Sequence, residues 1–320
     1  MTAPHATTFF DLTGRAQIEL TGSDRAKFLH NFCTNDIKRL GEGGGCEAFV
    51  TNIKGRVLGH IFVFATADSL WIDSVPGADE TLIAHLDRYL ITEDVVLNSR
   101  TEEFGEFFLT GPSAVDALAK MGIDAESLGL NGHSVLGAGE TFVTVRRVDW
   151  LNEPDFLMLV ACDKLENARS ALTAAGILES NPETFDALRI ESGFPLYGCD
   201  ISDENLAQEV GRTQQAISFT KGCYLGQEPI ARLDAMGHVN RQLCGLKLAS
   251  GPVPQRDSVI VADGGETEIG RVTSAAVLPA TNLPVALAYL RRQFLTPGTN
   301  VLVQTSGENI AATVSSCEPE

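Results

Sequence analysis

The sequence lacks the segments that would direct a chain to a membrane or across it. Its 320 residues contain no uncharged apolar run of about 18 residues, the length that a transmembrane helix needs. Residues 1–10 have neither the basic start and apolar stretch of a signal peptide nor the many arginines of a transit peptide. The sequence therefore predicts a chain with no membrane-spanning segment and no secretory segment.

Patterned cysteines are also absent. The seven cysteines are scattered and odd in number, and no Cys-x-x-Cys pair or Cys/His spacing typical of a zinc site occurs. We therefore expect no structural metal site. Scattered thiols without a disulfide framework are typical of a reducing compartment, so the sequence predicts a cytoplasmic protein.

Basic residues are few. The chain has 24 Lys and Arg against 42 Asp and Glu, which gives a formal net charge of −18. Binding to a phosphate backbone or to an anionic membrane depends on Lys and Arg, so we expect no direct nucleic-acid partner and no membrane partner. This composition still allows a local basic pocket for a small anion, and the acidity itself serves solubility.

Length and pattern indicate more than one domain. A chain of 320 residues exceeds what one core usually holds, and 44% hydrophobic residues supply enough apolar side chains for two or three cores. Beyond residue 241 only short alternating strands remain, which predict a small closed barrel. They lie at residues 243–248, 258–262, 268–277, 286–291, 301–304 and 310–315. We place the domain boundary near residue 240.

Helices and strands alternate before that boundary. Period-2 stretches predict strands at residues 15–21, 48–52, 57–65, 70–75, 95–97, 104–109, 141–148 and 156–161. Apolar stripes with end signals predict helices beginning near residue 23 and at 79–90, 112–121, 163–175, 182–193 and 223–235. Residues 129–139 are polar and Gly-rich, and residues 195–220 read as a long functional loop with some helix.

One stretch is denser in reactive groups than the rest of the chain. Residues 221–228 read Lys-Gly-Cys-Tyr-Leu-Gly-Gln-Glu, and the glycines at 222 and 226 predict backbone with positive φ or a close approach. A thiol beside a lysine favours a lowered pKa and a nucleophilic thiolate. The alternative is a buried cysteine that fills a gap in a core, because free cysteine is among the most buried residue types.

This stretch, followed by Ala231-Arg232, Gly237 and Arg241, resembles the hallmark of the YgfZ family. These are folate-binding proteins implicated in the assembly or repair of iron–sulfur clusters and, indirectly, in tRNA modification. Other motifs resemble the wider superfamily of glycine-cleavage T-proteins, the GcvT or aminomethyltransferase-like proteins. They are Gly22-x-Asp24-Arg25 with Thr34-Asn35-Asp36, Lys54-Gly55-Arg56-Val57-Leu58, Leu109-x-Gly111-Pro112, Leu188-Arg189-x-Glu191-x-Gly193-x-x-Leu196-Tyr197-Gly198, and Ile269-Gly270-Arg271-Val272 with Ala286-Leu287-Ala288-Tyr289.

The resemblance implies an α+β fold. Two αβ subdomains, intertwined in sequence within residues 1–240, are expected to surround a central cavity for tetrahydrofolate. Residues 241–320 are expected to form a C-terminal β-barrel domain.

The resemblance also implies folate contacts. Glu191 is expected to bind the pterin, because one carboxylate accepts hydrogen bonds from an amino group and a ring N–H side by side; its alternative is a surface acid at a helix end. Tyr197, in the same motif, is assigned to the folate site with it. Asp73 stands at a strand end where the superfamily has a polar residue near folate, or else begins a turn. Arg232 and Arg241 are expected to hold the glutamyl tail of folate. The alternative for both is a solvent-facing charge on a helix, which is favoured more for Arg241 than for Arg232.

His60 departs from the superfamily pattern. In the aminomethyltransferases the corresponding strand carries an aspartate that lies against the reacting nitrogen of folate. His60 either replaces this acid as a group that titrates near neutral pH, or is a structural hydrogen-bonding residue. The departure disfavours transferase chemistry.

Cys223 has three candidate roles: a nucleophilic or redox thiol, a transient ligand of iron or of a cluster, or a structural residue. One cysteine alone does not hold an iron–sulfur cluster, because clusters generally need four ligands. Lys221 is expected to stabilise the thiolate or a nearby anion.

The sequence thus predicts a folate-dependent accessory protein for iron–sulfur clusters, whose partners are a folate derivative and iron–sulfur client or assembly proteins. A tetrahydrofolate-dependent aminomethyltransferase and a folate-binding scaffold without catalysis are the alternatives, so whether the protein is an enzyme stays open.

Overall fold

The computed structural model describes residues 6–138, 141–305, 307 and 309–315. Residues 1–5, which begin the N-terminal stretch without signal-peptide features, and Cys317 lie outside the described residues. The chain divides into two compact units. The first unit contains Met1–Asn52, Leu58–Asn181 and Gln214–Leu225; the second contains Ile53–Val57, Pro182–Thr213 and Gly226–Glu320. The division at residue 240 therefore stays a prediction, because each unit combines separate parts of the chain.

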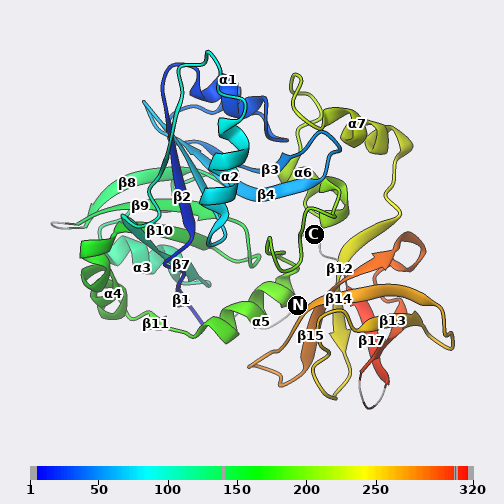
Figure 1. The fold of residues 1–320 in the computed structure, drawn as a ribbon. Coiled ribbons are helices and arrows are strands. Elements are labelled where there is room, and N and C mark those ends of the chain that lie inside the picture. Colours follow the sequence, from blue (N-terminus) through cyan, green and yellow to red (C-terminus); the bar gives the residue numbers. More distant parts are fainter. Residues whose placement is uncertain (1–5, 139–140, 306, 308, 316–320) are drawn as a thin grey trace. The chain divides into compact units, whose positions relative to one another are not determined.

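Two β-sheets form the frame of the first unit (Figure 1). The five-stranded sheet has the order β3-β4-β5-β2-β6, made of β2 (Ala16–Thr21), β3 (Gly45–Thr51), β4 (Val57–Ala65), β5 (Leu70–Ser74) and β6 (Val96–Ser99). The six-stranded sheet has the order β11-β1-β7-β10-β9-β8, made of β1 (Thr8–Asp11), β7 (Phe104–Thr110), β8 (His133–Ala138), β9 (Thr141–Val148), β10 (Asp155–Ala161) and β11 (Leu178–Glu179).

The helices of the first unit are α1 (Arg25–His30), α2 (Ala78–Asp87), α3 (Ala114–Lys120) and α4 (Leu165–Ala174), with 3₁₀ turns η1 (Ile37–Arg39) and η2 (Cys162–Lys164). The short α6 (Thr213–Ala216) begins at Thr213, which is the last residue of one segment of the second unit; the rest of α6 belongs to the first unit. Helix α2 packs on β2 and β6, and α4 packs on β10 and β11. Among the described residues, no helix is long and apolar enough to cross a membrane.

Side-chain alternation gives the five-stranded sheet two different faces. Ile18, Leu20 and Ile72 belong to one apolar cluster with residues of α1 and α2. Gln17 and Asp73, the next residues along the same strands, point to the opposite face, because successive side chains of a strand alternate. The helix-covered face is therefore a hydrophobic core, and the other face carries buried polar groups.

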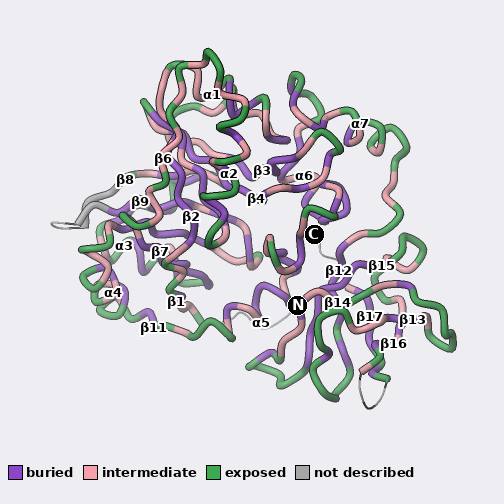
Figure 2. Tube along the Cα trace, viewed as in Figure 1, coloured by how far each residue is buried: buried purple, intermediate pink, exposed green. Residues whose placement is uncertain are grey.

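The six-stranded sheet has the same division. Phe107 and Leu109 of β7 join the apolar cluster that contains residues of α3 and α4, whereas Glu106 and Phe108 alternate to the other face. Figure 2 shows that the buried residues follow the strands. The faces of the two sheets that turn toward each other thus carry the buried polar groups together with aromatic rings such as Phe62, Phe108 and Trp150, and a helix layer lies outside each sheet.

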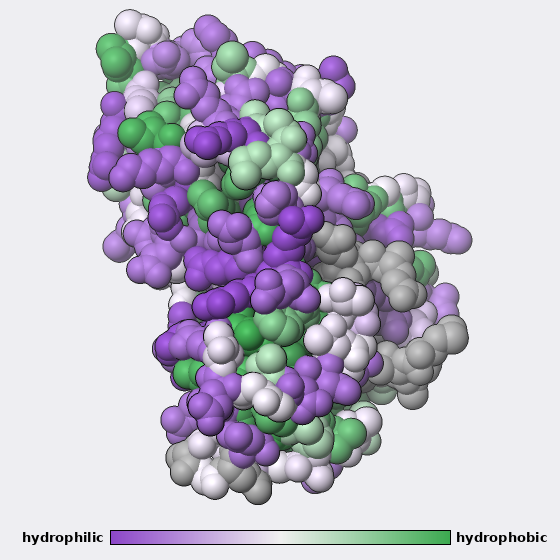
Figure 3. Space-filling model, turned by 90° about the vertical axis from the view of Figure 1, so that its right-hand side faces the viewer, coloured by the Kyte–Doolittle hydropathy of each residue, from purple (hydrophilic) through white to green (hydrophobic). Residues whose placement is uncertain are grey.

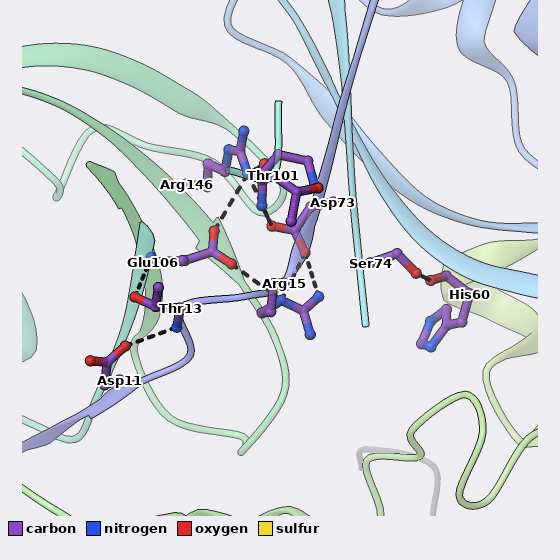
Figure 4. A network of polar contacts seen from close by, with 10 residues as sticks. Asp11, Thr13, Arg15, His60, Asp73, Ser74, Thr101, Glu106 and Arg146 are labelled. Carbon is purple, nitrogen blue, oxygen red and sulfur yellow. Dashed lines mark hydrogen bonds and ion pairs between the residues drawn. The ribbon is translucent and has the colours of Figure 1, made fainter. Parts of the chain in front are cut away.

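A cluster of buried charges joins the two sheets (Figure 4). Asp73 of β5 accepts hydrogen bonds at Oδ1 from Arg15 and at Oδ2 from Gln17 at 2.6 Å and Arg146 of β9 at 3.1 Å. Glu106 of β7 lies 3.2 Å from Arg15 Nε and 3.5 Å from Arg146 Nη1. We call these five residues the intersheet charge cluster. Its ion pairs run across the space between the sheets.

The two acids of the intersheet charge cluster titrate differently. Burial raises the pKa of Asp73, but Arg15 and Arg146 outweigh it and hold this pKa below its usual value. Burial and the nearby negative charge of Asp73 raise the pKa of Glu106 well above its usual value. Glu106 is therefore the acid of the pair that keeps its proton to higher pH.

The second unit contains the predicted β-barrel. Its strands are β12 (Arg241–Leu248), β13 (Val259–Ala262), β14 (Glu268–Val277), β15 (Pro284–Arg291), β16 (Asn300–Gln304) and β17 (Asn309–Ser315), closed in the order β12-β15-β14-β13-β16-β17. The other elements are α5 (Pro182–Ser192), α7 (Gln227–Met236) and the 3₁₀ turns η3 (Ala207–Val210) and η4 (Arg292–Phe294). Helix α5 packs on β12, β14 and β15. The α+β fold class with a C-terminal barrel is confirmed.

Three strands were not predicted. They are the short β1 and β11 and the strand β8, which occupies most of the polar, Gly-rich stretch of residues 129–139. Strand β8 is held by its neighbour, since His133 to Ala138 pair with Arg146 to Thr141 of β9. The face of the molecule drawn in Figure 3 is mostly hydrophilic, as the charge of the chain leads one to expect.

The intersheet charge cluster predicts a large cost for removing one cation. We expect Arg146→Met to lower the free energy of unfolding by about 3–5 kcal/mol, because Asp73 then keeps a buried charge with fewer partners. Arg39→Met, which removes the ion pair between the exposed Arg39 and the half-buried Asp36, is expected to cost less than about 1 kcal/mol. Urea unfolding of both variants measures the difference, and equal losses would contradict the role given to the cluster.

Candidate functional site

The loop that carries Cys223 is bound to the segment that follows α1. Residues 217–225 make backbone hydrogen bonds to it near both of their ends, from Ser218 N to Thr34 O at 2.9 Å and from Leu225 N to Asn31 O at 2.8 Å. The loop therefore has a defined path along the N-terminal segment of the first unit.

Lys221 is the buried residue that fixes this loop. Its Nζ donates hydrogen bonds to three backbone carbonyls, those of His30 at 2.6 Å, Cys33 at 2.7 Å and Asn35 at 2.7 Å. The same Nζ lies 4.7 Å from the centre of the Tyr224 ring. His30 is the last residue of α1, and the carbonyls at a helix C-terminus favour a cation. Burial lowers the pKa of Lys221, while its hydrogen bonds favour the charged form.

The ammonium of Lys221 is thus occupied by the backbone of the first unit. An ammonium has three donors, and three carbonyls take them. This geometry gives Lys221 a part in positioning the loop. A direct catalytic role for Lys221 beside the thiol stays a prediction.

Cys223 itself is exposed. It does not fill a gap in a core, so the packing alternative is wrong. Gly226, at the N-cap of α7, has φ 85° and confirms the expected positive φ. Gly222 is not among the residues with positive φ, and a Cβ there would meet His30 Nε2 at an ordinary 3.8 Å. Only the second glycine of the motif is therefore required by the backbone.

His60 lies on β4 in a buried pair with Glu47 of β3. Its Nε2 is 2.8 Å from Glu47 Oε1. The imidazole ring lies between aromatic rings, 5.1 Å from that of Phe49 and 5.3 Å from that of Phe62. These contacts favour the structural alternative, and a contact of His60 with folate stays a prediction.

Asp73 lies inside β5, so the expectation that it begins a turn is wrong. It is fully buried, and both carboxylate oxygens accept hydrogen bonds from the intersheet charge cluster. Asp73 and His60 come from paired strands, since Asp73 is opposite Phe62 and Ser74 Oγ donates to His60 O at 2.7 Å (Figure 4). A folate contact of Asp73 stays a prediction, and its contacts favour a structural role.

In the second unit, Glu191 and Tyr197 flank the end of α5. Glu191 is the penultimate residue of the helix, and both side chains are half-buried. Glu191 thus lies near the negative end of the helix, where the carboxylate is partly accessible. Burial, together with the charge of Asp203, raises the pKa of Tyr197. Tyr197 therefore keeps its proton at neutral pH.

A buried ion pair holds the turn that carries Tyr197. Asp200 accepts hydrogen bonds at Oδ2 from Arg189 Nη1 at 2.7 Å and from Leu196 N at 3.0 Å. Its Oδ1 accepts hydrogen bonds at 2.5 Å from the hydroxyls of Thr273 and Ser274 on β14. Neither Arg189 nor Asp200 was predicted as a site residue, although both lie in or beside the motif that contains Glu191.

The two arginines after the Cys223 motif differ in place. Arg232 is exposed on α7, at a hollow of about 480 Å³ that Leu233 and Met236 also line. Arg241 is not on that helix, which ends at Met236, but is the first residue of β12. Arg241 forms a two-point ion pair with Glu209, at 3.2 and 3.3 Å, so it is not simply a solvent-facing residue. A folate contact of Arg232 stays a prediction.

Two family models match the chain. The GCVT N-terminal domain matches residues 2–221, and the glycine cleavage T-protein C-terminal barrel domain matches residues 241–318.

Curated relatives match the chain along most of its length. A chloroplastic protein of Arabidopsis thaliana that is named as a transferase is 28% identical over 307 residues, which cover 95% of this chain and 69% of that protein. An aminomethyltransferase of Chlorobium chlorochromatii is 27% identical and covers 94% of this chain and 84% of its own length.

A solved structure has a similar fold. The glycine cleavage system aminomethyltransferase T from Bartonella henselae superposes with a TM-score of 0.86 at 20% identity. The match covers 97% of this chain and 85% of that one. At this identity the comparison shows the fold alone.

The contacts of Lys221 predict that it acts on structure, whereas Cys223 does not. We expect Lys221→Met to lower the free energy of unfolding by about 3 kcal/mol or more, because three carbonyls lose a charged donor. Cys223→Ser is expected to change it by no more than about 0.5 kcal/mol, because the side chain is exposed. Thermal and urea unfolding of both variants test this. A stable Lys221→Met variant would show that these hydrogen bonds do not hold the loop.

Proposed function

The chain belongs to the glycine cleavage T-protein family, and on that basis we propose that it is a folate-dependent accessory protein of the YgfZ type. Its task would be the assembly or repair of iron–sulfur clusters, with an indirect effect on tRNA modification. The observation that carries this proposal is an exposed thiol, Cys223, on a loop that the buried Lys221 ammonium fixes. We place the protein in the cytoplasm, as its unpatterned cysteines predict.

Cys223 has the properties of a group that acts on a partner. An exposed thiol on a fixed loop can reach a second protein without rearrangement of the first unit. Since one thiol does not hold a cluster, the other ligands must come from the client or assembly protein. The iron–sulfur cluster is therefore cargo that Cys223 contacts during transfer or repair.

The proposed cofactor is tetrahydrofolate, which supplies a carrier for one-carbon units when bound. Glu191 would accept hydrogen bonds from the pterin edge, and the neutral hydroxyl of Tyr197 would offer a donor beside it. The ion pair between Arg189 and Asp200 would keep both residues in place, because it ties the end of α5 to the next turn. Arg232 remains the proposed partner of the glutamyl tail.

A second candidate is a tetrahydrofolate-dependent aminomethyltransferase. One observation favours it beyond the names of the relatives. The buried carboxylate of Glu47 lies 2.8 Å from the His60 ring, so an acid is present on the neighbouring strand although the expected aspartate is absent. The buried aromatic surroundings of His60 favour the first candidate, because they leave this pair a structural role.

Folate binding is tested by titration with 5-methyltetrahydrofolate, followed by fluorescence or calorimetry. We expect saturable binding that Glu191→Ala weakens at least tenfold, since a charged hydrogen-bond pair contributes about 1.5–3 kcal/mol. Glu183→Ala, in the first turn of the same helix, is the matched control and is expected to bind like the wild type. Absence of saturable binding by the wild type overturns the folate proposal. Equal binding by both variants overturns the role of Glu191.

The role of Cys223 is tested in cells that lack the native protein. We expect Cys223→Ser to leave the activities of iron–sulfur enzymes under oxidative stress as low as in cells without the protein. The control is Cys162→Ser, which replaces another exposed thiol of the same unit and is expected to restore these activities fully. Full restoration by Cys223→Ser contradicts the proposal. A separate assay measures whether the protein forms methylene-tetrahydrofolate from an aminomethyl-lipoyl carrier. If the wild type forms it and His60→Ala does not, the second candidate function is established instead.

A further inference from the structure

Three arginines meet at one end of the barrel in the second unit. Arg241 is the first residue of β12, Arg291 is the last residue of β15, and Arg292 begins η4. Arg241 and Arg291 are direct partners in the antiparallel ladder, and Arg292 N donates to Asn240 O at 2.9 Å. In a chain of net charge −18, this is a local concentration of positive charge.

Like charges directly opposite each other in a ladder are destabilising. Glu209 offsets the repulsion between these positive charges for one arginine only. It forms the two-point ion pair with Arg241, whose guanidinium also lies 5.2 Å from the centre of the Tyr289 ring. Within the part of the chain that the structure describes, no ion pair or hydrogen bond is found for the side chains of Arg291 and Arg292. Two of the three positive charges are therefore left uncompensated by described residues.

All three arginines line one cavity of about 850 Å³, which Glu209 and His238 also line. Consecutive residues within a strand point to opposite faces. Arg291 and Arg292 are not bound by this rule, because Arg291 is the last residue of β15 and Arg292 is the first residue of a 3₁₀ turn. Both therefore line the same cavity. The polar side chains of Asn240, Gln293 and Thr296 line the same space. We call it the arginine cavity.

We propose that the arginine cavity binds a small phosphorylated molecule. Guanidinium groups match the oxygens of carboxylates and phosphates, and the fork of Arg241 is already taken by Glu209. A phosphoryl group presents three oxygens and carries close to two negative charges near neutral pH, so one such group would accept from Arg291, Arg292 and a neutral donor and would offset both uncompensated positive charges. The volume is that of a small-molecule site.

The net charge of the whole chain further limits the class of ligand that the arginine cavity would bind. An extended polyanion would approach a surface of net negative charge, which weakens its binding. A compact di- or trianion meets mainly the local field of the three arginines and Glu209, which is positive overall. The inference does not depend on the proposed function, since neither Glu191 nor Cys223 borders the arginine cavity.

The test is calorimetric titration of the full chain with sodium pyrophosphate, at constant ionic strength adjusted with sodium chloride. We expect saturable binding to one site, weakened at least tenfold in the double variant R291A/R292A. The matched control is K120A/K247A, which removes two positive charges from other exposed positions and is expected to bind like the wild type. Circular dichroism of both double variants checks that they are folded.

Two results overturn the proposal. One is the absence of saturable pyrophosphate binding by the wild type, and the other is equal binding by the two double variants. A parallel titration with citrate separates the ligand classes. Citrate that binds tighter than pyrophosphate rejects the phosphorylated class, and weaker citrate binding supports it. Unchanged affinity of R291A/R292A for 5-methyltetrahydrofolate confirms that the two sites are separate, and a loss of that affinity overturns their separation.

Discussion

The first unit depends on one constraint, the burial of two arginines and two acids between its sheets. Each sheet has a hydrophobic face covered by helices, so its other face must find a partner or water. The intersheet charge cluster provides that partner, because Arg15 and Arg146 each contact acids of both sheets. Ion pairs of this kind are a weak source of stability but are intolerant of slippage, since a shift leaves a charge buried without its partner. They therefore specify how the sheets face each other, and with that the place of His60 and Asp73.

The same use of a buried cation recurs at the two candidate ligand regions. In the first unit Lys221 holds three carbonyls, and in the second unit Arg189 holds Asp200 and the turn beyond α5. In both cases the buried charge is bound within the protein, while a neighbouring residue, Cys223 or Glu191, stays at least partly accessible. The motifs thus contain pairs of residues with divided roles. One residue positions the backbone, and the other is available to a ligand or partner.

The sequence predicts the strands of the barrel well. All six barrel strands were predicted, because alternation interrupted by Gly and Pro is a local signal that barrel packing reinforces. Strands β1 and β11 were missed because they are short and are held by pairing with each other from distant parts of the chain. Strand β8 was missed because its polar, Gly-rich sequence carries little strand pattern, although its partner β9 is the next strand along the chain. The partners of Lys221 and Asp73 were missed for a similar reason. No spacing rule connects residues that lie 191 or 58 positions apart. The exposure of Cys223 likewise depends on packing, which the eight residues around it do not determine.

The Lys221 hydrogen bonds join residues that are far apart in the sequence, and this separation affects the order of folding. Closing a loop of 191 residues is slow compared with forming a helix or a hairpin, and synthesis delivers the N-terminal segment first. The segment after α1 must wait for Lys221, as β1 must wait for its partner Leu178. The Cys223 loop therefore reaches its final geometry only after most of the chain has been made and collapsed. Until these hydrogen bonds form, nothing described in the structure fixes the thiol in place, so its position is a property of the assembled fold.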